Sequence, residues 1–412
     1  MELLAPDAVF ETHRSDARST PANGVLLVVP WDQEFGGVNS VVRNLARYLV
    51  ETGREPIFLF PGDTVRPREG VSRLGFPALY MNLRPVMVRQ RPVKSLGGFL
   101  LNAPIALHHL MRIVRERNIG VVNVHYPGDN TLYFAALHHL TGIRLVTSVH
   151  GSDLTGLPAR CFRRFTTSVL MRDSDVVVAP SQWFADYARH EFPASASKMI
   201  AIRNGIDSQV IRAVETKNGT EFVSHPLDGV GDIPYVVCVA AFNRKKAHDT
   251  LIRAFASVAG PSQLVLIGDG PLRADIERLI DELGLGGRIV LVGNQPPNIV
   301  ARVLAGAVCS VLPSRNEPFG IAAAESMALG TPVVTSGVGG LGEIVTHELT
   351  GLTFPVDDAP ALAAALNRLL GDHRLRERLA EAGSSYARTN FDWRRSASRY
   401  VEVAYSRSET RA

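Results

Sequence analysis

The strongest constraint on the fold is a repeated alternation of short apolar runs with segments of helical length. The runs are rich in Val, Ile and Leu and contain few polar residues, which indicates strands that are buried on both faces. Six of them lie at residues 25–29, 56–60, 119–124, 144–149, 175–180 and 198–202. Such strands, separated by helices, predict a parallel sheet with helices on both of its faces.

The alternation stops once and then resumes. Residues 204–233 are rich in Gly, Asp and Asn and have no sustained periodicity, which indicates a domain boundary. Five further runs follow at residues 235–241, 263–269, 288–294, 307–314 and 332–336. A chain of 412 residues is longer than one hydrophobic core usually supports. We therefore expect two α/β domains, each a doubly wound parallel sheet.

These patterns predict the domain boundaries. We expect a disordered N-terminus over 1–22, an N-terminal domain over 23–204, a linker over 205–233 and a C-terminal domain over 234–390. Residues 359–388 are expected to form two helices, and a last helix over 391–407 is expected to return to the N-terminal domain. Ligands of open α/β sheets bind at the carboxyl ends of the strands, so two facing sheets predict a cleft that holds the site.

Composition narrows the functional class. Hydrophobic residues make up 46% and charged residues 20% of the chain, which is typical of a globular protein. The three cysteines, Cys161, Cys238 and Cys309, are far apart, so neither a disulfide framework nor a zinc site is predicted. The sequence shows no secretory signal and no run long enough to cross a bilayer. We expect a cytoplasmic protein without a nucleic-acid partner.

The net charge of +4 is unevenly distributed. Lys and Arg outnumber Asp and Glu by 23 to 17 in residues 1–204, whereas the remainder has 21 against 23. Residues 82–117 carry seven basic residues and one acidic residue, Glu116, and include the apolar helical segment GFLLNAPIALHHLM. A basic flank beside an apolar surface suits peripheral contact with an anionic membrane, or an anionic lipid-linked substrate. A core helix with a solvated basic face is the alternative.

A pair of glycines follows the first predicted strand. Gly36 and Gly37 allow the backbone to approach a ligand closely, and the helix expected to begin near Val38 directs its N-terminal N–H groups to the same place. A phosphate suits such a site. A simple turn would explain the two glycines equally well.

A histidine follows the predicted strand at 144–149. His150 begins the sequence HGSD and is expected in the cleft, where it could donate a hydrogen bond to a hydroxyl or share a proton. A structural role in the turn is the alternative. The paired histidines at 108–109 and 138–139 are expected to pack rather than chelate, because adjacent residues diverge around a helix.

Three cations follow the first strand of the second domain. Arg244, Lys245 and Lys246 lie at a strand-to-helix junction that is expected to face the cleft. Three positive charges in this position suit a diphosphate. A solvated surface cluster is the alternative.

Two carboxylates occupy the apolar segment NEPFGIAAAESMALGTP at 316–332. Pro318 favours the first turn of a helix, which would place Glu317 at its mouth and Glu325 about two turns inside. A carboxylate among apolar neighbours is costly unless a polar group pairs with it, and no Lys or Arg lies at helical spacing from Glu325. Carboxylates accept hydrogen bonds from vicinal hydroxyls, so one could bind a sugar and the other a ribose. The N–H groups of residues 319–321 would meet a phosphate between them.

The order of these segments resembles a known family. The stretch NEPFGIAAAESMALGTPVVTS is similar to the E-x7-E signature of the retaining family 4 glycosyltransferases, among the glycosyl transferases of group 1. The segments GGV, HG-x-D, IRNGID (202–207), LIGDGP (266–271), GGLGEIV (339–345) and TGLTF (350–354) also correspond. The resemblance covers about residues 25–407 and implies the GT-B fold, in which two Rossmann-like domains face each other across a cleft.

The resemblance implies a role for each candidate residue. Those expected to be catalytic are His150, which would contact the sugar O6, Arg244, Lys246 and Glu317. Those expected to bind the donor are Gly36, Gly37, Asn294, Phe319, Gly320, Ile321 and Glu325. Weaker candidates on the acceptor side are Asp153 and His125. No metal site and no cofactor are expected, because the nucleotide sugar is a substrate.

One position departs from the family pattern. Where the family often has an arginine in a GRL turn, this chain has Ala241 and Phe242. One diphosphate cation is therefore missing from its usual place, and we expect Arg244 to replace it.

Two motifs have the sequence pattern of a dinucleotide site and of a metal site. GVGGLG at 337–342 satisfies the dinucleotide pattern G-x-G-x-x-G, but it follows the last strand of the second series, whereas that fingerprint belongs to the first βαβ unit of a domain. Asp173-Ser174-Asp175 has the form of a DxD metal motif, but it precedes a strand and so lies at the wrong end of the sheet. Neither is expected to bind a ligand.

The predicted function is transfer of a sugar from a UDP- or GDP-sugar to a carbohydrate or lipid-linked acceptor, with retained configuration, in polysaccharide or glycolipid biosynthesis. Two alternatives share the architecture. One is a nucleotide-sugar epimerase or hydrolase, and the other is a catalytically silent module that binds a nucleotide sugar.

Overall fold

The computed structural model describes residues 22–33, 36–87, 91–158, 161–207 and 233–406, together with Ile211, Val214, Leu227 and Val230. Three earlier predictions therefore lie largely outside the described residues. These are the disordered N-terminus, most of the linker at 205–233, and the contribution of Arg89 to the basic segment.

The first domain is built on an eight-stranded sheet in the order β3-β4-β2-β1-β5-β6-β7-β8. Every neighbouring pair is parallel except β3 and β4. The strands are β1 (Gly24–Val28), β2 (Glu55–Pro61), β3 (Arg68–Val71), β4 (Pro77–Met81), β5 (Ile119–His125), β6 (Arg144–Ser148), β7 (Val176–Ala179) and β8 (Met199–Ala201).

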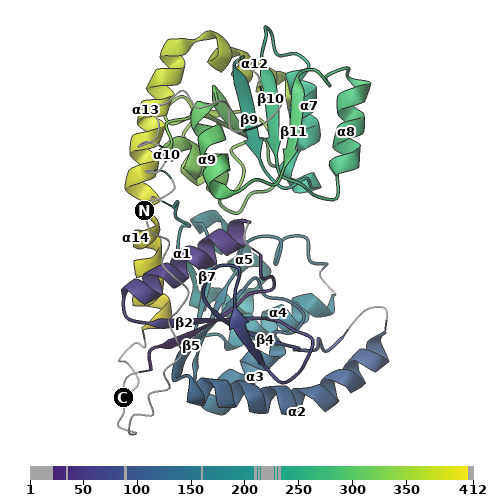
Figure 1. The fold of residues 1–412 in the computed structure, drawn as a ribbon, viewed down its shortest axis with the longest axis vertical. Coiled ribbons are helices and arrows are strands. Elements are labelled where there is room, and N and C mark those ends of the chain that lie inside the picture. The colour runs from purple at the N-terminus through teal and green to yellow at the C-terminus, as the bar shows by residue number, and fades with distance from the viewer. Residues whose placement is uncertain are drawn as a thin grey trace.

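The second domain is built on a six-stranded parallel sheet in the order β11-β10-β9-β12-β13-β14. Its strands are β9 (Tyr235–Val239), β10 (Gln263–Ile267), β11 (Ile289–Gly293), β12 (Cys309–Leu312), β13 (Val333–Thr335) and β14 (Leu352–Thr353). The expectation of two doubly wound parallel sheets is confirmed. Figure 1 shows the two domains facing each other.

Three strands were not predicted. β3 is exposed along its whole length and lies at the sheet edge, so no apolar run marks it. β4 begins with a proline and has only five residues, and β14 has only two. Short strands at or near sheet edges bury little apolar surface, and their sequences carry a correspondingly weak signal.

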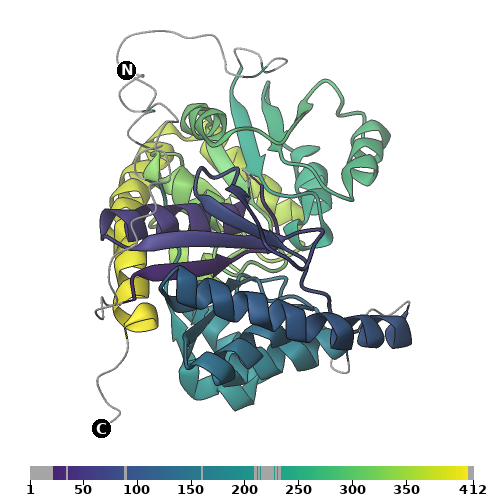
Figure 2. The same cartoon turned by 60° about the horizontal axis from the view of Figure 1, so that its bottom comes forward.

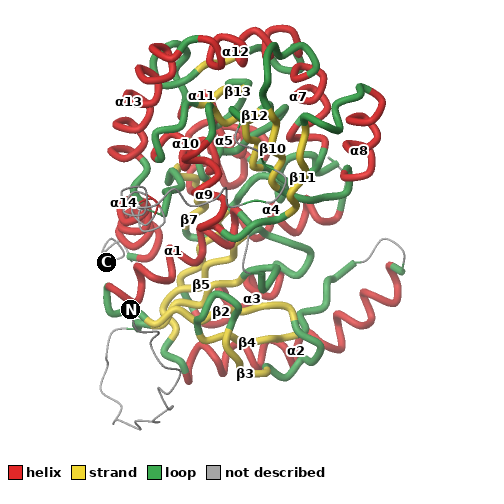
Figure 3. The backbone as a smooth tube through the Cα atoms, turned by 45° about the horizontal axis from the view of Figure 1, so that its top comes forward, coloured by secondary structure: helices red, strands yellow, loops and turns green. Residues whose placement is uncertain are grey.

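Helices cover both sheets (Figure 3). In the first domain they are α1 (Gly37–Glu51), α2 (Pro92–Glu116), α3 (Leu132–Thr141), α4 (Phe162–Asp173) and α5 (Gln182–Glu191). In the second they are α7 (His248–Phe255), α8 (Arg273–Glu282), α9 (Pro297–Gly306), α10 (Ile321–Ala328), α11 (Leu341–Ile344), α12 (Ala359–Gly371) and α13 (His373–Asn390). The short 3₁₀ helix η1 (Pro193–Lys198) precedes β8, and η2 (Arg244–Lys246) precedes α7.

β1 shows why the first sheet needs two helical layers. All five of its residues are buried. Val25 and Leu27 pack in one core with residues of α1, whereas Leu26 and Val28 pack in another with residues of α2 and α3. Successive side chains of a strand point to opposite faces, so a continuous apolar strand is stable only when both faces are covered.

The chain returns to the first domain at its C-terminal end. α13 belongs to the second domain, and it is followed by α14 (Trp393–Arg399), which lies beside α1 (Figure 1). The π-helical segment η3 (Tyr400–Tyr405) comes next and contacts β6. Trp393, Tyr400 and Tyr405 are buried in the core of the first domain. The amide of Asn123 in β5 donates to the Tyr405 hydroxyl over 2.8 Å. The predicted return of the last helix is confirmed.

The two domains touch through the N-terminus of α5. Ser181 caps this helix, and its hydroxyl donates to the carbonyl of Pro318 in the second domain over 2.6 Å. The Glu343 carboxylate, also in the second domain, accepts the N–H of Trp183 at 2.5 Å and that of Gln182 at 3.3 Å. A carboxylate at a helix N-terminus is stabilised by the helix dipole and by N–H groups that have no partner inside the helix.

None of the described helices is both long and apolar enough to cross a membrane.

Candidate active site

A cavity of about 510 Å³ lies between the two domains. The strand order reverses beside β1 in one sheet and beside β9 in the other, and the loops that follow β1, β5, β9 and β12 all contribute to the cavity walls. Ligands of doubly wound sheets bind at such switch points. The volume is within the range of ligand pockets, which hold about 300–1,000 Å³.

Most of the predicted residues meet in this cavity. Those that line it are Gly36, Gly37, His150, Lys246, Asn294, Glu317, Phe319, Gly320, Ile321 and Glu325. Three do not. Arg244, Asp153 and His125 lie outside the lining, and each requires a correction that is given below.

The glycine pair forms the junction between β1 and α1. Gly36 has a φ of 114°, a conformation that residues with a Cβ rarely adopt, and α1 begins at Gly37. A Cβ on Gly36 would meet nothing within 4 Å, so its backbone conformation, and not crowding, accounts for the glycine. The N-terminus of α1 therefore opens on the cavity, as the sequence predicted.

The cation cluster is split by its local geometry. Arg244, Lys245 and Lys246 form the 3₁₀ helix η2, in which successive side chains point about 120° apart, so the three cannot face one ligand together. Lys245 and Lys246 line the cavity, whereas Arg244 is exposed and lies outside it. The prediction that Arg244 replaces the missing arginine is therefore wrong about its position. Lys245, and not Arg244, lines the cavity beside Lys246.

Lys245 also contacts the first domain. Its Nζ donates to the Thr155 hydroxyl over 2.6 Å, and burial lowers the pKa of its ammonium group. Thr155 belongs to the turn that follows His150, so this hydrogen bond crosses the cavity from one domain to the other.

Lys246 and Glu317 form an ion pair inside the cavity. The distance from Lys246 Nζ to Glu317 Oε2 is 2.5 Å, and the glutamate is buried. The Ser314 hydroxyl donates to the same carboxylate oxygen over 3.4 Å. A buried carboxylate is costly without a partner, and here the lysine provides one. An anion and a hydroxyl that entered together could contact both charged groups.

α10 begins later than the sequence predicted. The helix begins at Ile321, after Gly320, which has a φ of 102°. Pro318 therefore lies in the preceding loop and not in the first turn. Glu325 is consequently little more than one turn inside the helix and not two. The backbone from Phe319 to Ile321 still lines the cavity where α10 begins.

Glu325 has no cation beside it among the described residues. Burial, and secondarily the negative charge of Asp207, raise the pKa of Glu325 to about 7. Asp207 lines the same cavity and is paired with Arg47 at 3.0 Å. A carboxyl group with this pKa changes its protonation state near neutral pH, so a ligand with hydroxyl donors can favour the ionised form.

His150 is supported from behind by two groups that the sequence assigned to the acceptor side. His125 is buried in β5, and its Nδ1 is 3.1 Å from His150 Nε2. The Asp153 carboxylate is also buried and accepts the N–H of His150 at 2.9 Å and that of Gly151 at 2.6 Å. Neither His125 nor Asp153 lines the cavity, and both lie behind His150 and hold its orientation through these contacts. Burial lowers the pKa of His150 to about 4, which leaves the imidazole neutral at pH 7.

The glycine-rich sequence 337–342 has a packing role. A Cβ on Gly339 would lie 2.3 Å from the Glu317 carbonyl oxygen, and one on Gly340 would lie 2.4 Å from that of Pro318. The Gly340 N–H donates to the Glu317 carbonyl over 2.8 Å. The glycines therefore allow this loop to pack directly against the loop that carries Glu317, which accounts for them without a dinucleotide.

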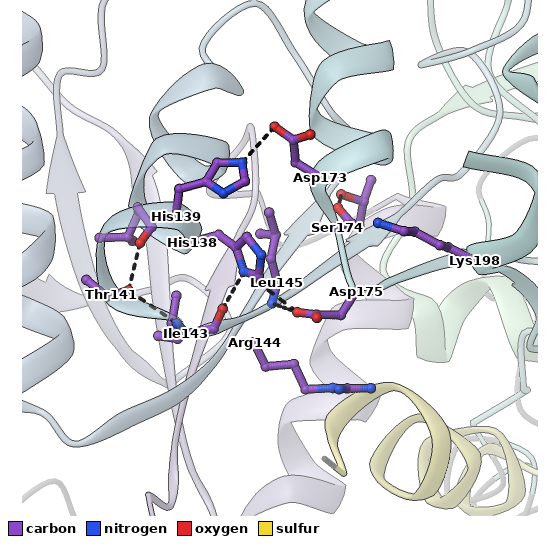
Figure 4. Close-up of polar contacts among 12 residues, drawn as sticks. His138, His139, Thr141, Ile143, Arg144, Leu145, Asp173, Ser174, Asp175 and Lys198 are labelled. Carbon is purple, nitrogen blue, oxygen red and sulfur yellow. Dashed lines mark hydrogen bonds and ion pairs between the residues drawn. The ribbon is translucent and has the colours of Figure 1, made fainter. Parts of the chain in front are cut away.

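The Asp173-Ser174-Asp175 motif lies at the amino ends of β6 and β7, and none of its residues lines the cavity. Figure 4 shows its polar contacts. The Asp175 carboxylate accepts the N–H of Leu145 over 2.8 Å, and Asp173 pairs with Arg172 and His139. His138 bonds the carbonyl of Ile143 over 2.7 Å. In the described part of the chain, no group of three or more His, Cys, Asp or Glu side chains could hold a metal ion.

Several cavity residues had no prediction. Among them are Arg43, Tyr126, Asn204, Asp207 and Asn316. Asn204 and Asp207 belong to the segment IRNGID, which was matched to the family without a role for its side chains. The position of this segment beside the cavity depends on tertiary packing, so only the motif match could have indicated it.

The arrangement can bind a molecule that carries both an anionic group and hydroxyls. Three cations, Arg43, Lys245 and Lys246, and the N-termini of α1 and α10 supply positive charge. Glu317, Glu325 and the neutral His150 supply hydrogen-bonding groups. These groups come from both domains, so a ligand in the cavity would contact both domains at once.

Comparison with known proteins shows two family matches that together cover most of the chain. Residues 226–386 match the family "Glycosyl transferases group 1", and residues 35–210 match "Glycosyltransferase Family 4". An uncharacterized glycosyltransferase of Methanocaldococcus jannaschii, MJ1607, is 32% identical over 394 residues, which are 92% of this chain and 97% of that protein.

Solved structures show the same fold. Sucrose-phosphate synthase from Thermosynechococcus elongatus has a TM-score of 0.74 at 24% identity, with 92% of this chain and 97% of that chain covered. Anabaena HepE, solved in complex with UDP and glucose, has a TM-score of 0.71 at 18% identity, with 92% and 98% covered.

Proposed function

Because the chain belongs to the glycosyl transferases of group 1 and has their GT-B fold, we propose that it transfers a sugar from a nucleoside diphosphate sugar to a hydroxyl acceptor with retention of configuration. The observation that carries the proposal is the Lys246–Glu317 ion pair beside the N-terminus of α10 in one interdomain cavity. The HepE structure, which holds UDP and glucose, supports this class of donor.

The donor lies across the mouth of α10 in this proposal. The diphosphate contacts Lys246, Lys245 and the backbone N–H groups at Gly320 and Ile321, and the Gly36-Gly37 junction approaches it from the first domain. The ribose hydroxyls donate to Glu325. The sugar hydroxyls donate to Glu317, and His150 contacts the sugar from the opposite domain.

Departure of the nucleoside diphosphate is the step that the site assists. The bond from C1 to the phosphate oxygen breaks, so negative charge grows on the phosphate and positive charge on C1. Cations and N–H groups that are already in place stabilise the leaving phosphate without reorganisation, which is usually a large part of catalysis. The phosphate oxygen then takes the acceptor's proton on the same face while the acceptor oxygen bonds to C1.

The acceptor is proposed to be a carbohydrate or a lipid-linked carbohydrate in polysaccharide or glycolipid synthesis, and the donor a UDP- or GDP-sugar. Incubating the protein with a panel of nucleotide sugars and a pool of such acceptors should release the nucleoside diphosphate and form a glycoside. Proton NMR of the product should show the donor's anomeric configuration. Rapid formation of free or epimerised sugar without an acceptor would contradict transfer, and so would donor binding without turnover on any acceptor.

No resident metal takes part in the proposed step. We expect turnover to be unchanged after dialysis against EDTA, because Lys246 and the helix N–H groups supply the charge that a metal would otherwise supply. If dialysis abolishes activity and added Mg²⁺ or Mn²⁺ restores it, the proposed metal-independent step is wrong.

Glu343→Ala is expected to weaken closure of the two domains. It removes the carboxylate that accepts two N–H groups of α5, and hydrogen bonds to a charged group contribute about 1.5–3 kcal/mol each. We expect a larger radius of gyration by small-angle X-ray scattering and a donor KM raised about tenfold. Glu381→Ala, at an exposed glutamate of α13 in the same domain, is the control. Unchanged scattering and KM in Glu343→Ala would show that this contact does not hold the domains together.

The affinity for the free nucleoside diphosphate is expected to rise from pH 6 to pH 8. Glu325, whose pKa is raised to about 7, is protonated at the lower pH and must ionise to accept both ribose hydroxyls. Binding then releases a proton, and the affinity should fall by up to about tenfold for each pH unit below 7. The same pH series is measured by calorimetry on Glu325→Gln, in which the nucleotide's own phosphate still titrates but residue 325 does not. If both proteins have the same pH dependence, Glu325 does not contact the ribose.

A further inference from the structure

The outward side of α2 is apolar. Five large hydrophobic side chains within 13 residues point away from the domain, and they are defined here as the outer face of α2: Val93, Leu96, Leu100, Leu101 and Ile105. Leu101 is 79% exposed and Leu100 is 61% exposed. Exposed apolar residues are ordinary when single, but a contiguous group on one helix marks a contact surface.

The helix is held by its opposite side, so the outer face is not needed for folding. Ala106, Leu110 and Ile113 are buried in the core of the first domain, and Asn102 accepts a hydrogen bond from the Tyr133 hydroxyl. Figures 1 and 2 show that the N-terminal half of α2 extends beyond the body of the domain. This half carries the outer face.

Cations surround the outer face. Arg84, Arg91 and Lys94 are exposed, and none of them forms an ion pair within the described residues. Arg112 lies further along the helix and pairs with Glu116. The sequence from 82 to 115 contains no Asp or Glu. An apolar stripe with a basic border and no acidic residue is complementary to an anionic lipid surface.

We propose that the outer face of α2, with Arg84, Arg91 and Lys94, binds the surface of an anionic bilayer. The apolar side chains would enter the boundary between headgroups and acyl chains, while the cations remain among the phosphates. A second copy of this chain is a poorer occupant, because a symmetric contact would bring two identical sets of cations together. The charges therefore favour a membrane over self-association.

The position of α2 leaves the active site free to work. The helix lies at the end of the first domain that is remote from the second domain (Figure 1). A protein bound to a bilayer through this end can therefore open and close its cavity without moving the membrane contact. The inference does not depend on the proposed donor, because binding to a bilayer requires no nucleotide.

Vesicle flotation of the full chain tests the proposal. The probes are phosphatidylcholine vesicles with and without phosphatidylglycerol, and the variants are Leu100→Ser/Leu101→Ser/Ile105→Ser and Arg84→Glu/Lys94→Glu. The apolar and the basic substitutions should each lower the partition coefficient of the protein on anionic vesicles by about tenfold or more. Leu349→Ser and Arg253→Glu, at exposed residues of the second domain, are matched controls that should bind as the unmodified protein does.

Further measurements separate the outcomes. Binding should weaken at high salt and be small on vesicles of phosphatidylcholine alone. Thermal unfolding and nucleotide affinity of the variants should be unchanged, which shows that the fold and the cavity are intact. The proposal is overturned if the unmodified protein does not bind anionic vesicles, or if the variants bind as well as it does. It is also overturned if the apolar variant instead converts a dimer into a monomer in size-exclusion chromatography.

Discussion

Lys246→Ala is expected to lower kcat by about 10²–10³-fold, the range measured when one preorganised group that stabilises a developing negative charge is removed. Lys246 is the cation that lies beside both Glu317 and the N-terminus of α10, where the leaving phosphate is placed. The loss should be larger in kcat than in KM, because the charge on the phosphate grows as the C1–O bond breaks. Steady-state kinetics with the donor identified in the panel gives the measurement.

Arg244→Ala is the matched comparison for this prediction. Arg244 is two residues away in the same 3₁₀ helix, but its side chain is exposed and outside the cavity. It should retain turnover within about twofold of the unmodified protein. Thermal unfolding should be measured for both variants, because Lys246→Ala also leaves the buried Glu317 without its partner and could lower the stability of the fold. Equal losses in the two variants would show that Arg244 faces the ligand as Lys246 does, and unchanged turnover in both would show that Lys246 does not contact the leaving phosphate.

Glu317→Gln is expected to lower kcat by about 10²-fold while the protein stays folded. The amide keeps the size of the side chain and one acceptor oxygen, but it removes the charge that pairs with Lys246 at 2.5 Å and that would accept the sugar hydroxyls. Affinity for the free nucleoside diphosphate should change little, because that molecule lacks the transferred sugar that Glu317 is proposed to contact. Kinetics together with calorimetry separates these two effects.

Glu282→Gln, at an exposed position on α8, is the control for the loss of one carboxylate. If Glu317→Gln weakens binding of the free nucleoside diphosphate as strongly as it lowers kcat, the glutamate supports the lysine or the loop and does not contact the sugar. If the variant turns over at the unmodified rate, the assignment of Glu317 is wrong.

The two-domain architecture could be predicted because it depends on local signals. Continuous apolar runs such as VLLVV at 25–29 can be stable only where both faces are covered, and their regular spacing with helices leaves few alternatives to parallel sheets. The same rule placed the site, since residues that follow strands lie at the carboxyl edge. Glu317, Lys246 and His150 were found in this way and do meet in one cavity.

The errors came from features that a sequence pattern does not fix. Arg244 and Lys245 are neighbours with similar side chains, and only the 3₁₀ conformation of η2 decides which one faces the cavity. The start of α10 moved from Pro318 to Ile321 because Gly320 adopts a positive φ. His125 lies behind His150 because β5 and β6 are paired, and that pairing places His125 opposite Ser148, two residues before His150.

The interdomain cavity is proposed to bind a sugar nucleotide between Lys246 and the N-terminus of α10. A crystal structure of the full chain with a nucleoside diphosphate tests it most directly. We expect phosphate oxygens within hydrogen-bond distance of Lys246 Nζ and of the backbone N–H groups at Gly320 and Ile321, with the ribose hydroxyls on the Glu325 carboxylate. A nucleotide bound elsewhere, or bound in this cavity with its phosphates turned away from Lys246, would contradict it.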